Sequence, residues 1–220
     1  MRKVITGAFV SLDGVMQAPG GPEEDPTGGF KLGGWVAPFA DEVFGKAVEQ
    51  LFTPPYDLLL GRKTYEIFAA HWPYQSSDDP IAKSFNAVTK YVATRSDLPL
   101  TWQKSVALRD AATEVARLKK ENGPNFVTQG SSDLIQTLLA QDLIDELHVF
   151  TFPVLLGRGK RLFGAGTKPV GLKLVESKVS TTGVTLSLYQ RAGGVATGDF
   201  ATKPPSEAEL KRRERMKREH

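Results

Sequence analysis

The sequence predicts an α/β fold in which a mainly parallel central sheet carries helices on both faces. Segments with the pattern of buried strands alternate with segments of helical periodicity through residues 1–165, as in parallel βαβ units. Two further strand patterns, at residues 172–180 and 184–191, are joined by a Thr-Thr-Gly turn. They predict an antiparallel hairpin at the end of the sheet.

The first part of the chain begins with a predicted strand at residues 4–12, followed by a loop at 17–34 that is rich in glycine, proline and acidic residues. A helix is predicted at 40–52 because its apolar residues recur on one face at helical spacing, and a proline pair ends it. A buried strand at 56–60 then runs directly into a helix that starts at Gly61.

The remaining elements before the hairpin are predicted strands at 90–94, 125–129 and 144–152 and predicted helices at 79–88, 107–121 and 134–139. Asp78 or Asp79 caps the first of these helices, with Pro80 in its first turn. Ser131 or Ser132 caps the last one. An Asn-Gly-Pro sequence closes the helix between them.

Three of the predicted strands leave small, polar or basic residues at their C-terminal ends. Arg62 and Lys63 follow one strand, Arg95 follows the next, and Gly130 follows the third. In an open parallel sheet, ligands bind in the crevice outside these ends. Gly130 lets the backbone approach a pyrophosphate, and the basic residues suit an extra phosphate such as the 2′-phosphate of NADP. The alternative for each basic pair alone is a solvated first helical turn.

Several segments together resemble a known family. They are residues 4–16, 60–66, 129–132, 145–149 and 153–163. The chain resembles the dihydrofolate-reductase-like fold and, more closely, the reductase domain of the bacterial bifunctional riboflavin deaminase–reductase, the RibD C-terminal family. The resemblance covers residues 1 to about 191 in order. It implies a three-layer fold, NADPH as cofactor and a reductase activity.

The resemblance also implies which residues contact the cofactor: Ala8, Val15, Gly61, Arg62, Lys63, Thr64, Thr94, Arg95, Ser96, Gln129, Gly130, Ser131 and Ser132. Ala8 and Val15 would do so through their backbone groups, beside the nicotinamide carboxamide. Ala8 is equally well interpreted as a small core residue. Trp35 and Trp72 are the aromatic residues expected beside a flat substrate ring.

Hydride transfer to a C=N or C=O bond also needs a proton. Asp13 is a candidate for binding the substrate or relaying this proton, although its position before Gly14 equally favours a turn. Dihydrofolate reductases use a carboxylate at the start of the first helix, and Asp41 and Glu42 lie there in this chain. Both are equally explained as favourable charges at a helix N-terminus. The sequence therefore leaves the proton donor unassigned.

The chain departs from the riboflavin reductases at residues 15–20, which are apolar and neutral where those enzymes carry a basic and hydroxyl-bearing segment. This difference counts against a phosphorylated substrate, although both a 5-amino-6-(5-phosphoribosylamino)uracil reductase-like and a dihydrofolate reductase-like activity stay open. The deaminase half is absent, so the chain resembles a stand-alone reductase that need not act in riboflavin biosynthesis. The family is often dimeric, and the strand at 147–156 and the hairpin are the expected contacts of a homodimer.

The composition argues against metal, membrane and nucleic-acid binding. The chain has no cysteine, and its histidines are not at metal-ligand spacing, so no metal site is expected. No apolar run could cross a membrane, and a net charge of +3 does not argue for nucleic acid. Residues 1–191 are expected to form the reductase domain, in the cytoplasm, and 192–220 a charged tail that is partly helical or flexible.

The sequence thus favours an NADPH-dependent reductase of a pyrimidine- or pterin-like heterocycle, working by direct hydride transfer. The alternative is a nucleotide-binding regulatory or interaction module without turnover, and the unassigned proton donor is the reason to keep it.

Overall fold

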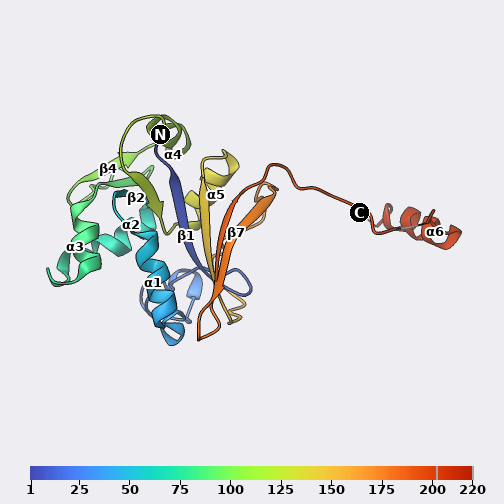
Figure 1. Cartoon of the computed structure of the whole chain (residues 1–220), viewed down its shortest axis with the longest axis horizontal. Helices are drawn as coiled ribbons and strands as arrows, with labels where there is room; N and C mark the ends of the chain where they lie inside the picture. Colours follow the sequence, from blue (N-terminus) through green and yellow to red (C-terminus); the bar gives the residue numbers. More distant parts are fainter. Residues whose placement is uncertain (202, 220) are drawn as a thin grey trace.

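The computed structural model describes residues 1–201 and 203–219 and contains one eight-stranded sheet (Figure 1). The strands are β1 (Val4–Ser11), β2 (Tyr56–Gly61), β3 (Lys90–Ala93), β4 (Ser105–Leu108), β5 (Asn125–Thr128), β6 (Glu146–Phe152), β7 (Leu172–Val179) and β8 (Thr185–Arg191). Their order is β4-β3-β2-β5-β1-β6-β8-β7. The strands β1 to β6 pair in parallel, and β8 is antiparallel to both β6 and β7. The predicted mainly parallel sheet with an antiparallel C-terminal hairpin is confirmed.

Helices cover both faces of the sheet. They are α1 (Glu42–Leu51), α2 (Arg62–Ala69), α3 (Pro80–Ala87), α4 (Ala111–Leu118), α5 (Ser132–Ala140) and, beyond the sheet, α6 (Glu207–Met216). Leu51, Tyr65 and Phe85 of α1, α2 and α3 belong to one apolar cluster with β2 and β3. Val115 and Ile135 of α4 and α5 belong to a second cluster with β1 and β5. Burial of apolar side chains on both sides of the sheet confirms the predicted three-layer arrangement.

The predicted helix at 107–121 is wrong in its first part. Residues 105–108 form β4, which pairs in parallel with β3 at the edge of the sheet. The helix begins only after Asp110, whose carboxylate accepts the N–H of Thr113 at 3.1 Å. A strand of four residues is too short to show an alternating pattern of its own. Because an alanine-rich helix follows it, the sequence predicts one continuous helix.

The segment after β1 is an ordered loop that crosses the end of the sheet. It contains the short 3₁₀ helices η1 (Thr27–Gly29) and η2 (Ala37–Phe39). The Gln17 side-chain amide donates to the backbone oxygens of Asp25 and Thr27, both at 2.9 Å. The indole N–H of Trp35 donates to the backbone oxygen of Gln17 at 2.8 Å. These bonds join separate parts of the loop to one another and keep it folded.

After β8 the chain leaves the sheet and ends in α6, which lies apart from the main body (Figure 1). The hydroxyl of Ser206 accepts the N–H of Glu209 at 3.3 Å and caps this helix. Thr202 and His220, which belong to the predicted tail, lie outside the described residues. Within residues 1–201 and 203–219, no helix has the length and apolar character needed to cross a membrane.

Candidate functional site

The C-terminal ends of five neighbouring strands open into one cleft of about 1100 Å³. Because the sheet order is β4-β3-β2-β5-β1, the residues after each strand follow one another along the cleft. In that order they are Arg109 and Asp110, then Thr94 and Arg95, then Arg62 to Thr64, then Gln129 to Ser132, and finally Met16 to Gly20. The predicted convergence of the three strand ends is therefore observed, and the site runs from a basic end to the loop after β1.

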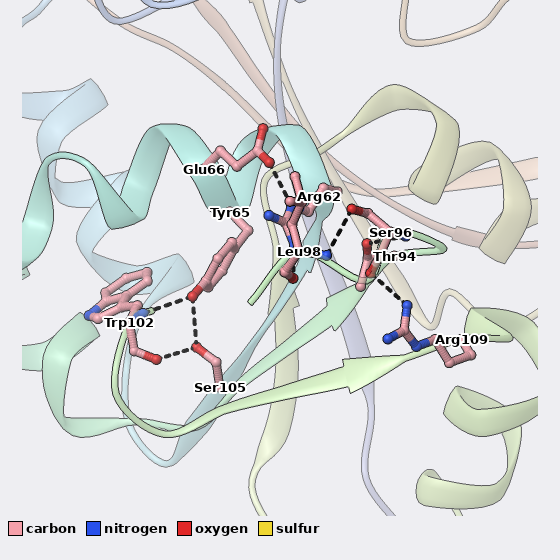
Figure 2. A network of polar contacts seen from close by, with 9 residues as sticks. All are labelled: Arg62, Tyr65, Glu66, Thr94, Ser96, Leu98, Trp102, Ser105 and Arg109. Atoms are coloured by element: carbon pink, nitrogen blue, oxygen red, sulfur yellow. Dashed lines mark hydrogen bonds and ion pairs between the residues drawn. The ribbon is translucent and has the colours of Figure 1, made fainter. Parts of the chain in front are cut away.

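The basic end is organised around the short loop after β3 (Figure 2). Arg62 is oriented by Glu66 at 2.6 Å and by the backbone oxygen of Leu98 at 3.0 Å. Arg109 donates to the backbone oxygen of Ser96 at 2.6 Å. Arg95 is exposed and lines the cleft. Three guanidinium groups thus converge on one end of the cleft, two of them held in place by the protein, which suits recognition of a phosphate.

The middle of the cleft is formed by the N-termini of α2 and α5. Asp41, Asp79, Asp110 and Ser206 cap the other four helices with side-chain hydrogen bonds. The two helices whose N-termini meet in the middle of the cleft have no side-chain cap, because Gly61 precedes α2 and the hydroxyl of Ser131 makes no capping bond to α5, contrary to the predicted serine cap. Their first N–H groups therefore remain available to an anion between them.

Two glycines, Gly61 and Gly130, allow the backbone segments before α2 and α5 to approach each other closely. The N–H of Gly61 donates to the backbone oxygen of Gly130 at 3.1 Å. A Cβ atom on Gly61 would lie 2.3 Å from the Ser131 hydroxyl oxygen. Gly130 has φ +138°, and a Cβ atom there would lie 3.1 Å from the hydroxyl oxygen of Thr64. This close, donor-rich cradle has the chemistry of a diphosphate site.

The other end of the cleft is built by two loops far apart in sequence. The backbone N–H of Lys160 donates to the Gln17 side-chain oxygen at 3.0 Å. The ammonium group of Lys160 pairs with the Asp25 carboxylate at 2.5 Å. Neither Gln17 nor Asp25 was predicted to lie at the site, and a solvated loop was the favoured interpretation of Lys160. The glycine, proline and acidic residues at 17–34 indicated a loop. Only tertiary contacts bring this loop against the loop after β6.

Glu24 lines this end of the cleft and is half-buried. One carboxyl oxygen, Oε2, accepts the backbone N–H groups of Gly20 at 2.5 Å and Gly21 at 3.2 Å. Burial raises the pKa of Glu24 above its ordinary value, against the effect of these two N–H donors, and the neighbouring Asp25 adds to the rise. Glu24 was not among the predicted site residues.

The two predicted acid candidates are not among the cleft residues. The Asp13 carboxylate accepts the hydroxyl of Ser11 at 2.6 Å and the N–H groups of Leu156 and Gly157 at 3.1 and 2.9 Å. These bonds, that from Ser11 first, lower the pKa of Asp13 to about 2. Asp13 thus joins the loop after β1 to the loop after β6.

Asp41 caps α1 and also joins that helix to the β7–β8 turn. It accepts the N–H of Phe44 at 2.8 Å and the hydroxyl of Thr181 at 2.7 Å. The bond from Phe44 is the largest of the contributions that hold the pKa of Asp41 well below its usual range. Its position at the hairpin favours the structural interpretation over the catalytic one.

Of the remaining residues predicted to contact cofactor or substrate, some lie in the core and one lines the cleft. Ala8 and Val15 are fully buried, and Trp35 is buried against Phe152 with ring centroids 5.3 Å apart. None of the three side chains is among the cleft residues. Trp72 does line the cleft, where it packs beside Phe68 and Phe85 on one wall. Of the predicted substrate contacts, the structure therefore brings only Trp72 to the cleft.

Comparison with known proteins agrees with this architecture. Residues 2–186 match the sequence model of the family described as RibD C-terminal domain. An uncharacterized protein of Bacillus subtilis, YyaP, is 27% identical over 195 residues, covering 87% of this chain and 96% of its own length.

Two solved structures show the same fold. One is a pyrimidine reductase-like protein from Corynebacterium diphtheriae, which is 14% identical with a TM-score of 0.57, over 87% of this chain and 92% of that one. The other is dihydrofolate reductase from Enterococcus faecalis, complexed with NADP(H) and a further ligand, which is 16% identical with a TM-score of 0.54, over 86% of this chain and 96% of that one.

Proposed function

Because the chain belongs to the RibD C-terminal domain family, we propose that it is an NADPH-dependent reductase of a pyrimidine- or pterin-like heterocycle. The observation that carries the proposal is the pair of uncapped helix N-termini at Gly61 and Ser131, which meet in the same cleft as Arg62 and Arg95. A dinucleotide with a diphosphate and one additional phosphate matches this arrangement of donors and charges.

The residues present fit NADPH from one end of the cleft to the other. The N–H groups at the starts of α2 and α5 would hold the diphosphate, and Arg95 with Arg62 would hold the 2′-phosphate. When bound, NADPH supplies the hydride. The protein contributes binding, orientation and a partly closed cleft, with Phe9 and Trp72 as apolar surfaces for flat rings.

The charge assignment is tested with the variants Arg62→Ala and Arg95→Ala. Each is expected to weaken NADPH binding about tenfold or more and NADH binding about twofold or less, since only NADPH carries the 2′-phosphate. The measurement is calorimetric titration with both nucleotides. Arg158→Ala removes an exposed guanidinium that is not among the cleft residues and serves as the matched control. Equal losses for NADPH and NADH would contradict the assignment of the 2′-phosphate.

The second candidate is a nucleotide-binding module without turnover. It is favoured by the positions of Asp13 and Asp41, which leave both predicted acids outside the cleft residues. Oxidation of NADPH at 340 nm with dihydropterins and aminopyrimidines separates the two functions. Turnover of any of these compounds would reject the binding module, whereas nucleotide binding without turnover would favour it over the reductase.

A further inference from the structure

We infer that Glu24 is the catalytic acid of this site, which binds the substrate heterocycle and protonates it as the ring is reduced. The inference rests on the proposed reductase function and adds to it the residue that the sequence left unassigned. It starts from the position of the Glu24 carboxyl in the cleft and from the state of every other acid there.

The order of the strands places Glu24 at the substrate end. The basic residues follow β3 and β4, the diphosphate cradle follows β2 and β5, and the loop that contains Glu24 follows β1. A nucleotide whose phosphates occupy the first two places directs its nicotinamide towards the third. Met16 links the diphosphate cradle to the loop after β1, since its methyl group lies 3.6 Å from where a Cβ atom of Gly130 would be.

The loop holds the Glu24 carboxyl in place. Its Oε2 atom accepts two backbone N–H groups, and a Cβ atom on Gly20 would lie only 3.0 Å from this oxygen. Gly33 packs just as closely on the other side of the loop, since a Cβ atom there would be 2.4 Å from the backbone oxygen of Gly21. Two glycines therefore permit the loop to fold tightly around this side chain.

Other charged side chains also line the cleft. They are Asp25 and Lys160 from the two loops, Arg62, Lys63 and Glu66 from α2, Arg95, Arg109 and Asp110 beyond β3 and β4, and Asp133 from α5. The four acids among them are engaged elsewhere or solvated. Asp25 pairs with Lys160 at 2.5 Å, Glu66 pairs with Arg62 at 2.6 Å, Asp110 caps α4, and Asp133 is exposed.

Glu24 differs from these acids because it is half-buried and, in the part of the chain that the structure describes, pairs with no cation. Burial disfavours its ionised form, and the Lys160 ammonium group, which lines the same cleft, is already compensated by Asp25. A carboxyl group with these surroundings keeps its proton to a higher pH than an ordinary glutamate does, as a general acid must.

Hydride addition to the carbon of a C=N bond moves the π electron pair onto the nitrogen, and this nitrogen takes the proton of the Glu24 carboxyl. The C–H and N–H bonds form while the Glu24 O–H bond breaks. Glu24 is left as a carboxylate that recovers a proton from water, and NADPH is oxidised to NADP⁺.

The test compares the wild type with Glu24→Gln, which keeps the shape of the side chain and removes the proton. The probe is 7,8-dihydrofolate, which carries a reducible C=N bond. With saturating NADPH, we expect Glu24→Gln to lower the single-turnover rate at pH 6 by about 100-fold or more and to leave NADPH affinity within about twofold. The wild-type rate should fall as pH rises through the Glu24 pKa, and the variant should lose this dependence. Glu23→Gln, an exposed neighbour, is the control.

A second readout does not depend on turnover. Carbon-13 NMR of the glutamate carboxyl groups, assigned by comparison with Glu24→Gln, measures the Glu24 titration in the NADPH complex. An elevated pKa supports the inference, and a pKa at or below the ordinary glutamate value overturns it. Turnover with an unchanged rate and pH profile in Glu24→Gln also overturns it while leaving the reductase intact. Failure of the wild type to bind NADPH contradicts the proposed function itself.

Discussion

The ammonium group of Lys90 is buried in the core between β3 and α3. Its side chain is fully buried, Nζ donates to the backbone oxygen of Asn86 at 3.1 Å, and it lies 4.3 Å from the centroid of the Trp102 ring. Burial, with a smaller contribution from the charge of Lys104, lowers the pKa of Lys90 to about 8. A charge held by one carbonyl and one aromatic face opposes folding at neutral pH.

The residue-scale prediction concerns the pH dependence of stability. Between pH 8 and about 10.5, folded Lys90 is neutral while the unfolded chain still binds the proton, so the free energy of unfolding rises with pH from this residue. Lys90→Met removes the charge at every pH. We expect the variant to gain stability relative to the wild type at pH 7, on the order of 1–3 kcal/mol, and to lose this advantage progressively towards pH 10.

Urea unfolding at pH 7 and pH 10 measures both effects in the wild type and in Lys90→Met. The exposed Lys83 of α3 provides the matched control Lys83→Met, for which the stability difference from the wild type should be the same at both pH values. A Lys90→Met difference that does not change between the two pH values would mean that the Lys90 pKa is not depressed.

At the scale of elements, the junction of α2 with α5 determines the shape of the cleft. The two helices follow β2 and β5, which are neighbours in the sheet, so their N-termini meet directly. Gly61 has φ −69° and ψ 155°, a conformation that alanine adopts without strain. The reason for glycine at this position is therefore the close approach of Ser131 alone.

Gly61→Ala tests this junction. The added methyl group would lie 2.3 Å from the Ser131 hydroxyl oxygen and 2.8 Å from its backbone nitrogen, so the start of α5 must move. We expect NADPH affinity to fall about tenfold or more, measured by tryptophan fluorescence quenching. Gly45→Ala in α1 is the control, because a Cβ atom there meets no other atom within 4 Å. It should raise stability by about 0.5–1 kcal/mol without changing affinity.

At the scale of the whole molecule, the C-terminal segment is attached to the sheet at its start, and this is its only backbone attachment among residues 192–201 and 203–219. The N–H of Ala192 donates to the backbone oxygen of Gly171, and the N–H of Gly171 donates to that of Gly193, both at 2.8 Å. Beyond this point α6 is held by its own ion pairs, such as Arg212 with Glu209 at 2.6 Å. Such exposed pairs along one helix stabilise that helix rather than the fold of the sheet.

A chain that ends at Gly194 is therefore expected to fold as the full chain does. Its melting temperature should lie within about 2 °C of that of the full chain, because no core contact is removed, and its NADPH affinity should be unchanged. Calorimetry on both proteins measures these quantities. A large loss of stability would show that α6 packs against the domain, or against a second copy of it, in solution.

The sequence by itself determined the alternation of strands and helices, the hairpin and the residues that follow each strand. It also determined local features such as the cap of α3, which it placed at Asp78 or Asp79 and which the structure places at Asp79. These depend on neighbours along the chain. The convergence of Arg62, Arg95 and Gly130 could be predicted as well, since the C-terminal ends of parallel strands share one edge of a sheet.

Tertiary structure alone decided which acids lie in the cleft. Asp13 and Asp41 were candidates by position in the chain, yet each is taken up by hydrogen bonds to a segment more than a hundred residues away. Glu24 lines the cleft because the loop after β1 folds back on itself and meets Lys160 through Asp25. No local periodicity encodes such contacts, because they form only when separate loops pack together at the mouth of the sheet.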